Sequence, residues 1–343
     1  MVYVAVFLVA FLLALVITPL AASLGRRWGL VDVPGGRRQH VGSVPRTGGW
    51  ALFLPFLAAA ALSTCLGPRL PAPEGIDPNE SRRLAGVLAG SAFMFLAGLL
   101  DDRRELKPRS QLLAQFGAGA IAVAGLLFIE RVRNPFSDEL IVLPFFLTVL
   151  VTLVWVVGMI NTVNFLDGLD GLAAGVTGVV AIVLFIHMYQ AGQHSVSLLP
   201  LALLGCTLGF LPYNWYPARV FMGSTGSFFL GYALATVSVA GGPRLATMML
   251  LLLVPVVDVG WLILLRSRRS GTFVLADRRH LHFRLVDLGY SQRQVVVGYM
   301  VLSAVFGIVA LVVASRVVKL VALVALAGVV ALALALLAKR SEP

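Results

Sequence analysis

Apolar segments of about 20 residues alternate with short polar loops along nearly the whole chain. A segment of that length spans the hydrocarbon core of a bilayer as one α-helix. The apolar residues come in blocks instead of one stripe per helix, so we expect these segments to face lipid. The pattern predicts eleven spans: 2–24, 48–66, 84–100, 112–129, 143–160, 172–189, 196–213, 227–243, 245–265, 294–314 and 318–338.

The boundary between the eighth and ninth spans depends on a hinge around Gly241, Gly242 and Pro243. The first span has no basic segment before it and no small-residue cleavage site after it, so we expect it to remain as an anchor. Cys65 and Cys206 each lie within an apolar segment. We expect both to be buried as small apolar side chains, with no disulfide or metal role.

Composition supports the same fold class. The 343 residues are 59% apolar and only 13% charged, and the mean hydropathy is +0.92. Soluble domains carry more charge because water must hydrate their surface. We therefore predict an all-α polytopic membrane protein of about eleven transmembrane helices, with residues 1–343 forming a single integral-membrane domain.

The distribution of basic residues predicts the orientation. Eleven spans place 19 of the 27 Lys and Arg residues on one side of the membrane and eight on the other. The richer side is expected to be cytoplasmic, which puts the N-terminus outside and the C-terminus inside. The net charge of +11 is explained by these loops and by anionic lipid, so no nucleic-acid partner is expected.

Two of the loops on the basic side are candidates for phosphate binding. The first carries Arg38 and His40 after two glycines, followed by Arg46. Arginine binds phosphate through two parallel hydrogen bonds, although such a loop also serves as an orientation anchor. The other loop, 214–227, contains Gly-Ser-Thr-Gly-Ser before a predicted helix. It would offer backbone N–H groups to an anion, or simply provide an N-cap.

Acidic and amide side chains gather at the ends of two spans. Asp101 and Asp102 directly follow the third span, where adjacent carboxylates repel each other and favour a bound cation or a shifted pKa. The alternative is an exposed acidic helix end that pairs with nearby arginines. After the fifth span come Asn161, Asn164, Asp167 and Asp170, which would share one helix face and form a row of hard oxygen ligands suited to Mg²⁺.

The last basic-side loop alternates imidazole and guanidinium groups at Arg279, His280, His282 and Arg284. Zinc lacks a third ligand nearby, and the density of arginines suits a diphosphate better; a solvated basic segment is the alternative. Asp258 lies inside the ninth span, and an ionisable residue there is a functional candidate by default.

Taken together, the motifs from about Asp32 to Gln294 resemble the polyprenyl-phosphate N-acetylhexosamine-1-phosphate transferases of glycosyltransferase family 4, in the WecA/TagO-like branch related to MraY. The resemblance implies transfer of N-acetylglucosamine 1-phosphate, or a close N-acetylhexosamine 1-phosphate, from a UDP-sugar to polyprenyl phosphate, with release of UMP. It implies Mg²⁺, with Mn²⁺ as a substitute. It also implies a multi-pass protein of the bacterial cytoplasmic membrane whose active site faces the cytoplasm and whose product starts a cell-envelope polysaccharide.

The resemblance also assigns roles to residues. Asp101, Asp102, Asp167 and Asp170 are the expected catalytic carboxylates, and Asn164 and the residue at position 224 are the expected metal ligands. The expected substrate contacts are Arg38, His40, Arg46, Asn161, Asn214, Arg279, His280, His282 and Arg284.

Three positions depart from the family pattern. Ser224 stands where the family has a metal-binding Asp, Gln111 stands where a basic residue is usual, and Phe283 replaces a second adjacent histidine. These departures motivate a second hypothesis, a non-catalytic paralogue that binds nucleotide or lipid. A lipid transporter is a third hypothesis, weakened by the absence of a repeated half-sequence. A homo-oligomer is compatible with the sequence, but nothing in the sequence indicates one.

Overall fold

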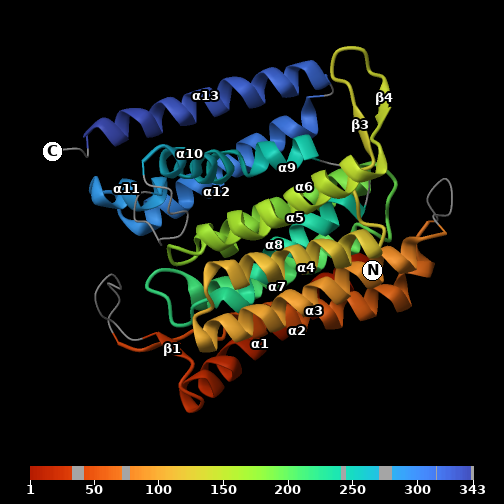
Figure 1. Ribbon diagram of the computed structural model, residues 1–343. Coiled ribbons are helices and arrows are strands. Elements are labelled where there is room, and N and C mark those ends of the chain that lie inside the picture. Colours follow the sequence, from red (N-terminus) through yellow and green to blue (C-terminus); the bar gives the residue numbers. More distant parts are fainter. Residues whose placement is uncertain (33–41, 72–77, 241–244, 270–279, 314, 341–343) are drawn as a thin grey trace.

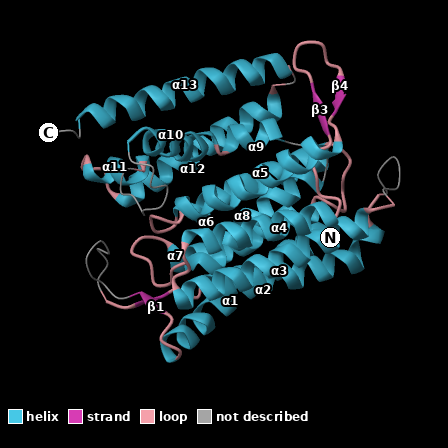
Figure 2. Ribbon diagram, in the orientation of Figure 1, coloured by secondary structure: helices cyan, strands magenta, loops and turns pink. Residues whose placement is uncertain are grey.

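The computed structural model describes residues 1–32, 42–71, 78–240, 245–269, 280–313 and 315–340. Helices make up almost all of the regular structure (Figures 1 and 2). They are α1 (Val2–Arg27), α2 (Gly48–Leu66), α3 (Glu80–Arg104), α4 (Pro108–Ala124), α5 (Phe145–Leu166), α6 (Leu172–Gln190), α7 (Leu198–Asn214), α8 (Gly223–Ala240), α9 (Leu245–Leu251), α10 (Leu253–Arg269), α11 (Leu281–Asp287), α12 (Gln292–Val312) and α13 (Arg316–Arg340), with a 3-10 turn at Gly67–Arg69.

Two short antiparallel pairs complete the regular structure of the described residues. Strand β1 (Val31–Asp32) pairs with β2 (Val44–Pro45), and β3 (Arg131–Arg133) pairs with β4 (Leu140–Val142). The pairs lie at opposite ends of the helix bundle, with β1 near the end that holds α11 and the C-terminus (Figure 1). The N-terminus lies toward the end of the β3–β4 hairpin, so the two termini are at opposite ends.

The predicted fold class is confirmed: the chain is an all-α polytopic membrane protein. Each of the eleven predicted spans coincides with helix in the described part of the chain. By length and composition, seven helices of the described residues can cross a membrane, namely α1, α2, α3, α5, α6, α12 and α13 up to Leu336. Helix α7 and the first part of α10 are shorter apolar helices. The count of eleven crossings stays a prediction.

The ninth predicted span is not one continuous helix. Its first part is α9 and its second part is α10, with a turn at Leu252 between them. Pro255 lies in the first turn of α10 and has no N–H to donate to the carbonyl of Leu251, which explains the break. The predicted hinge at Gly241, Gly242 and Pro243 lies outside the described residues.

Helix α8 is the central element of the bundle. Every residue of α8 from Thr225 to Ala240 is buried, by α3 and α5 and also by α2. Glycines of α3 make this close approach geometrically feasible: a Cβ added at Gly90 would lie 2.0 Å from the Tyr232 hydroxyl. That hydroxyl donates to the carbonyl of Gly86 at 2.9 Å. Small residues at the crossing are how membrane helices pack closely without a hydrophobic driving force between them.

The outer helices present apolar side chains, as expected for surfaces that face lipid. On α1 a stripe at every fourth position is exposed, while Val6, Ala10 and Ala14 on the other side are buried. The exposed stripe is Val4, Leu8, Leu12, Val16 and Leu20. Cys206 is buried as expected, but the prediction for Cys65 is wrong, because its side chain is exposed near the end of α2.

A substitution at Gly98 tests the packing of α3 on α8. A Cβ at this position would lie 2.5 Å from the carbonyl oxygen of Ser224 and from the Cα of Thr225, so backbone must move. We expect Gly98→Ala to destabilise the protein by about 1–3 kcal/mol, measured by thermal unfolding in detergent. Gly158→Ala is the matched control, since nothing lies within 4 Å of its Cβ position. Equal melting temperatures for the two variants would contradict the packing described above.

Candidate active site

Backbone hydrogen bonds join two distant loops at the end of the bundle that holds β1. The amide of Phe221 donates to the carbonyl of Pro45 at 2.8 Å, and the amide of Gly48 donates to the carbonyl of Phe221 at 3.0 Å. Gly49 donates in the same way to Met222. The segment before α2 is therefore paired with the segment before α8. This pairing sets Arg46, one of the predicted phosphate contacts, beside the start of α8.

The carboxylate of Asp102 caps the N-terminus of α8 by accepting hydrogen bonds from its backbone N–H groups. Its Oδ1 accepts from the amide of Ser224 at 2.8 Å, and its Oδ2 accepts from the amide of Thr225 at 2.9 Å and from the Thr225 hydroxyl. These N–H groups have no partner within the helix, and the helix dipole favours a carboxylate there. Gly223 permits this approach: its φ is +70°, and a Cβ would lie 2.7 Å from an oxygen of Asp102.

The two adjacent carboxylates of α3 have different partners. Asp101 is nearly buried and accepts from the amide of Leu106 at 3.0 Å and from the Gln111 side chain at 2.8 Å. It thereby holds the turn between α3 and α4. Gln111, one of the departures from the family pattern, is therefore part of this turn and supplies a neutral donor to Asp101.

The predicted row of oxygen ligands does not continue along one helix face. Helix α5 ends at Leu166, and residues 167–171 form turns, so Asp170 does not extend the row. Asp170 instead accepts from the amide of Ala218 at 2.9 Å. Gly171, with a φ of +81°, is the residue from which α6 begins, so the chain changes direction between Asp167 and Gly171.

The two asparagines of α5 lie toward different neighbours. Asn164 donates to the hydroxyl of Ser227 in α8 at 3.0 Å, which places it beside the Asp102 region. Asn161 exchanges hydrogen bonds with Gln115 of α4, donating at 2.7 Å and accepting at 3.3 Å. Asn161 thus joins α5 to α4, and a contact with substrate stays a prediction.

Asn214 is buried at the end of α7 and bridges two loops. It accepts from the amide of Gly171 at 3.1 Å and donates to the carbonyl of Val220 at 3.0 Å. The side chain therefore ties the acidic turn 167–171 to the segment before α8. The structure gives it a role in loop position; direct substrate binding stays a prediction.

Asp167 is a carboxylate whose surroundings disfavour its charged form. Burial is the largest cause that raises its pKa well above the usual value, and the charges of Asp102 and Asp170 raise it further. Arg46 opposes these effects, and it also forms an ion pair with Asp32. Asp102, Asp167, Asp170 and Arg46 therefore act on one another electrostatically, although they come from three separate loops.

The segment that contains His280, His282 and Phe283, here named the histidine loop, packs over the acidic turn 167–171. His282 is buried, and a Cβ on Gly168 would lie 2.6 Å from its Nε2, so only glycine allows this contact. Phe283 packs on the same glycine, which gives the third departure from the family pattern a place in the structure. His282 Nε2 and one Arg284 nitrogen are buried without a hydrogen-bond partner among the described residues. Such unpaired buried atoms are uncommon and indicate a site that a ligand completes.

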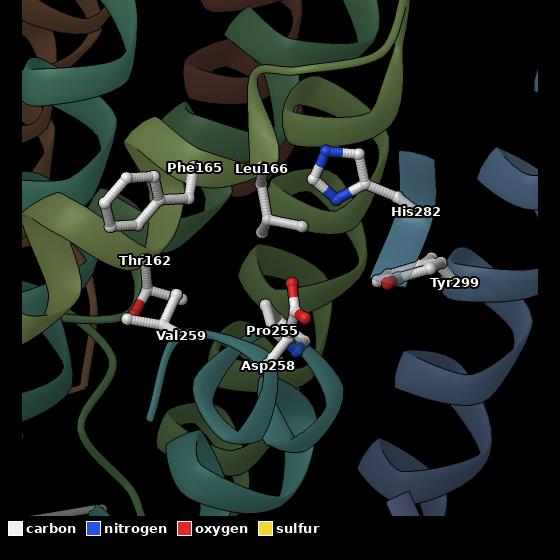
Figure 3. Close-up of a pocket in the computed structure, with 8 residues that line it drawn as sticks. All are labelled: Thr162, Phe165, Leu166, Pro255, Asp258, Val259, His282 and Tyr299. Atoms are coloured by element: carbon white, nitrogen blue, oxygen red, sulfur yellow. The ribbon is translucent and has the colours of Figure 1, made fainter. Parts of the chain in front are cut away.

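Asp258 anchors the histidine loop from within α10. It accepts from His280 Nδ1 at 2.8 Å and from the amide of Leu281 at 2.9 Å. Figure 3 shows Asp258 directed toward Leu166, with His282 and Tyr299 beside it. These residues line a crevice that is too narrow to hold a water molecule. Asp258 therefore lies beside His280 and His282, two of the predicted substrate contacts, whose roles stay predictions.

Three predicted substrate contacts, Arg38, His40 and Arg279, lie outside the described residues. Among the described residues, sequence reasoning missed Thr225, Gln115 and Gly168. Thr225 had only an N-cap signal, and Gln115 lies within an apolar segment where its partner was not evident. Gly168 has no side chain to signal a role, and its contact with His282 joins residues more than a hundred positions apart.

The donor set can be compared with the needs of Mg²⁺. The described residues hold no group of three or more His, Cys, Asp or Glu side chains arranged to bind a metal. Mg²⁺ is often held by one or two carboxylates together with substrate phosphates and water. The excess negative charge at Asp167 and the amide of Asn164 fit that mode of binding. They do not fit a metal site built from protein ligands alone.

Comparisons with known proteins agree with the family resemblance of the sequence motifs. Residues 84–242 match the family described as glycosyl transferase family 4. The chain is 30% identical over 315 residues to a Bacillus subtilis (strain 168) protein named probable undecaprenyl-phosphate N-acetylglucosaminyl 1-phosphate transferase, covering 90% of this chain and 84% of the relative. It is 32% identical to a Haemophilus influenzae undecaprenyl-phosphate alpha-N-acetylglucosaminyl 1-phosphate transferase, covering 87% and 82%. It is 31% identical to a Mycobacterium tuberculosis decaprenyl-phosphate N-acetylglucosaminephosphotransferase, covering 85% and 77%.

The charge at Asp167 gives a stability prediction. Because the folded state raises the pKa of Asp167, its ionised form destabilises the protein once the pH exceeds the ordinary aspartate value of about 4. We expect Asp167→Asn to raise the melting temperature at pH 7 in the absence of divalent cations. The gain should shrink as the pH falls toward 4, where the native carboxyl is protonated. A melting temperature that falls at pH 7 would contradict this description.

Proposed function

The chain belongs to glycosyl transferase family 4, and on that premise we propose that it transfers N-acetylglucosamine 1-phosphate, or a close N-acetylhexosamine 1-phosphate, from a UDP-sugar to polyprenyl phosphate. The observation that carries the proposal is the near-complete coverage of relatives whose names describe this transfer. The protein is an integral membrane enzyme, a phosphotransferase that acts on a lipid acceptor.

The reaction exchanges one diphosphate bond for another. An oxygen of the lipid phosphate forms a bond to the phosphorus that bears the sugar. The bond from this phosphorus to the oxygen of the nucleotide phosphate breaks, and UMP leaves with that oxygen. Both reactants are anions, so the site must neutralise charge at the reacting phosphorus and hold the two in line.

The described residues suit this task because opposite charges meet at one end of the bundle. Arg46 and the N-terminus of α8 bring positive potential, and the buried Arg284 nitrogen without a protein partner is a further donor for phosphate. The apolar exterior of the helices gives the polyprenyl chain an environment like the bilayer. We propose that Arg38, His40 and Arg279 add to the phosphate contacts.

We propose Mg²⁺ as the cofactor, held by Asp167 with Asn164, and with Ser224 nearby in place of a carboxylate. When bound, it would supply the charge that offsets repulsion between the two phosphates. Asp102 then has two functions: it fixes the start of α8 and adds negative charge beside Asp167. Asp170 positions the loop before α8 through Ala218.

We also propose a location. The excess of Lys and Arg on the side of these loops favours a cytoplasmic active site in a bacterial cytoplasmic membrane, where UDP-sugars are available. The N-terminus is then outside and the C-terminus inside, and the chain acts as one transferase domain.

A transfer assay tests the proposal. Purified protein with UDP-N-acetylglucosamine and undecaprenyl phosphate should release UMP and form the lipid diphosphate sugar, detected by mass spectrometry. Removal of divalent cations with EDTA should stop the reaction, and Mg²⁺ should restore it. We expect Asp167→Asn to lower the rate by about 10²-fold or more. Glu139→Gln, which removes an exposed carboxylate of the distant hairpin, should leave the rate unchanged. No UMP under any of these conditions would refute the proposed activity.

The serine at position 224 gives a separate prediction about the cation. We expect Ser224→Asp to tighten Mg²⁺ binding roughly tenfold, because a carboxylate adds charge to the site. Mn²⁺ electron paramagnetic resonance would measure this without turnover. Without a cation, the same variant should melt at a lower temperature, since the new charge lies beside Asp102. Ser224→Asn is the control, with the same size and no charge. Equal Mn²⁺ affinity for the aspartate and asparagine variants would show that position 224 does not contribute to cation binding.

A further inference from the structure

Asp258 is a buried acid within a helix of the apolar bundle, and the mechanism above does not use it. Its exposed fraction is 3%. A carboxylate in such a place is costly unless it is paired and fully hydrogen-bonded. Both of its oxygens have partners from the histidine loop, His280 Nδ1 and the amide of Leu281.

The bond to Nδ1 determines how His280 can interact with a ligand. Because Nδ1 is occupied by the carboxylate, only Nε2 remains for substrate. The carboxylate accepts the hydrogen on Nδ1, which fixes the position of that hydrogen and leaves the lone pair of Nε2 to accept from a ligand. The ring is further fixed by Phe165, at 5.0 Å between ring centres, and by His282, stacked at 5.5 Å.

The same arrangement extends from Asp258 to the acidic turn. His280 stacks on His282, and His282 contacts the Gly168 position between Asp167 and Asp170. Burial is the main cause that lowers the pKa of His282 to about 3, and His280 lowers it further, so His282 is neutral at physiological pH. The two histidines therefore differ: one has a carboxylate partner for its proton and the other has none.

We propose that Asp258 is a positioning residue for substrate, which holds His280 by Nδ1 so that its Nε2 is presented as a hydrogen-bond acceptor to the nucleotide sugar. The inference rests on the proposed function for the identity of the ligand. It assigns to Asp258 control over which ring nitrogen of His280 carries the hydrogen, in addition to fixing the start of α11.

Two substitutions of similar shape separate this role from simple anchoring. Asp258→Asn can still accept from the Leu281 amide and can still hydrogen-bond to Nδ1, but its amide nitrogen donates to Nδ1, so the ring hydrogen moves to Nε2 and Nε2 can no longer accept. His280→Asn keeps a donor at the Nδ1 position and removes Nε2. If Asp258 only anchors the loop, both hydrogen bonds survive in Asp258→Asn and binding stays normal.

We expect Asp258→Asn and His280→Asn each to raise the KM for UDP-N-acetylglucosamine about tenfold or more, with a much smaller change in kcat. The double variant should be no worse than either single variant, because both remove the same interaction. Glu139→Gln is the control, because it makes the same carboxylate-to-amide change on the exposed β3–β4 hairpin far from His280, so KM and kcat should be unchanged.

Nitrogen-15 NMR of labelled histidine provides a readout that does not depend on turnover. In the unmodified protein, one histidine should show its ring hydrogen on Nδ1, and this signal should be lost in Asp258→Asn and in His280→Asn. A normal KM in Asp258→Asn, or effects that multiply in the double variant, would overturn the role of Asp258. Absence of UDP-sugar binding by the unmodified protein would instead overturn the proposed function.

Discussion

The carboxylate of Asp102 at the N-terminus of α8 is the interaction on which the arrangement of the site depends. It joins the end of α3 to the start of the most buried helix of the bundle. The segment before α8 is in turn hydrogen-bonded to the segment before α2, which carries Arg46. A single carboxylate thus satisfies N–H groups that the helix itself cannot pair, and it fixes the relative position of three loops.

The bilayer explains why the chemistry is confined to one end. Within the hydrocarbon region each backbone group must be paired inside its own helix, so irregular backbone and charge are admitted only at helix ends or where protein surrounds them. Asp258 lies within a helix and still obeys this rule, because His280 and the backbone amide of Leu281 donate hydrogen bonds to its carboxylate. Interior contacts elsewhere rely on small residues such as Gly90 and Gly98, which carry no polar side chain.

The sequence was sufficient for the fold class and for the segments that meet at the site, since both follow from local apolar length and from short motifs. It was not sufficient for the partners of individual side chains. Asp101 and Asp102 are adjacent in sequence, yet one holds the turn to α4 and the other caps α8. Their immediate neighbours in the sequence do not distinguish them. The partners of Asp101 are 5 and 10 residues away, whereas those of Asp102 are 122 and 123 residues away. Likewise, the row from Asn161 to Asp170 was predicted from helical spacing, but α5 ends at Leu166 and residues 167–171 form turns.

The contact between His282 and Gly168 also affects the order in which the protein can become competent during its synthesis. The acidic turn is made more than a hundred residues before the histidine that covers it. At ribosomal rates of about 5–20 residues per second, this interval lasts on the order of ten seconds. During that time Gly168 lacks the cover of α11. This part of the site can therefore be completed only after the last helices of the chain are made.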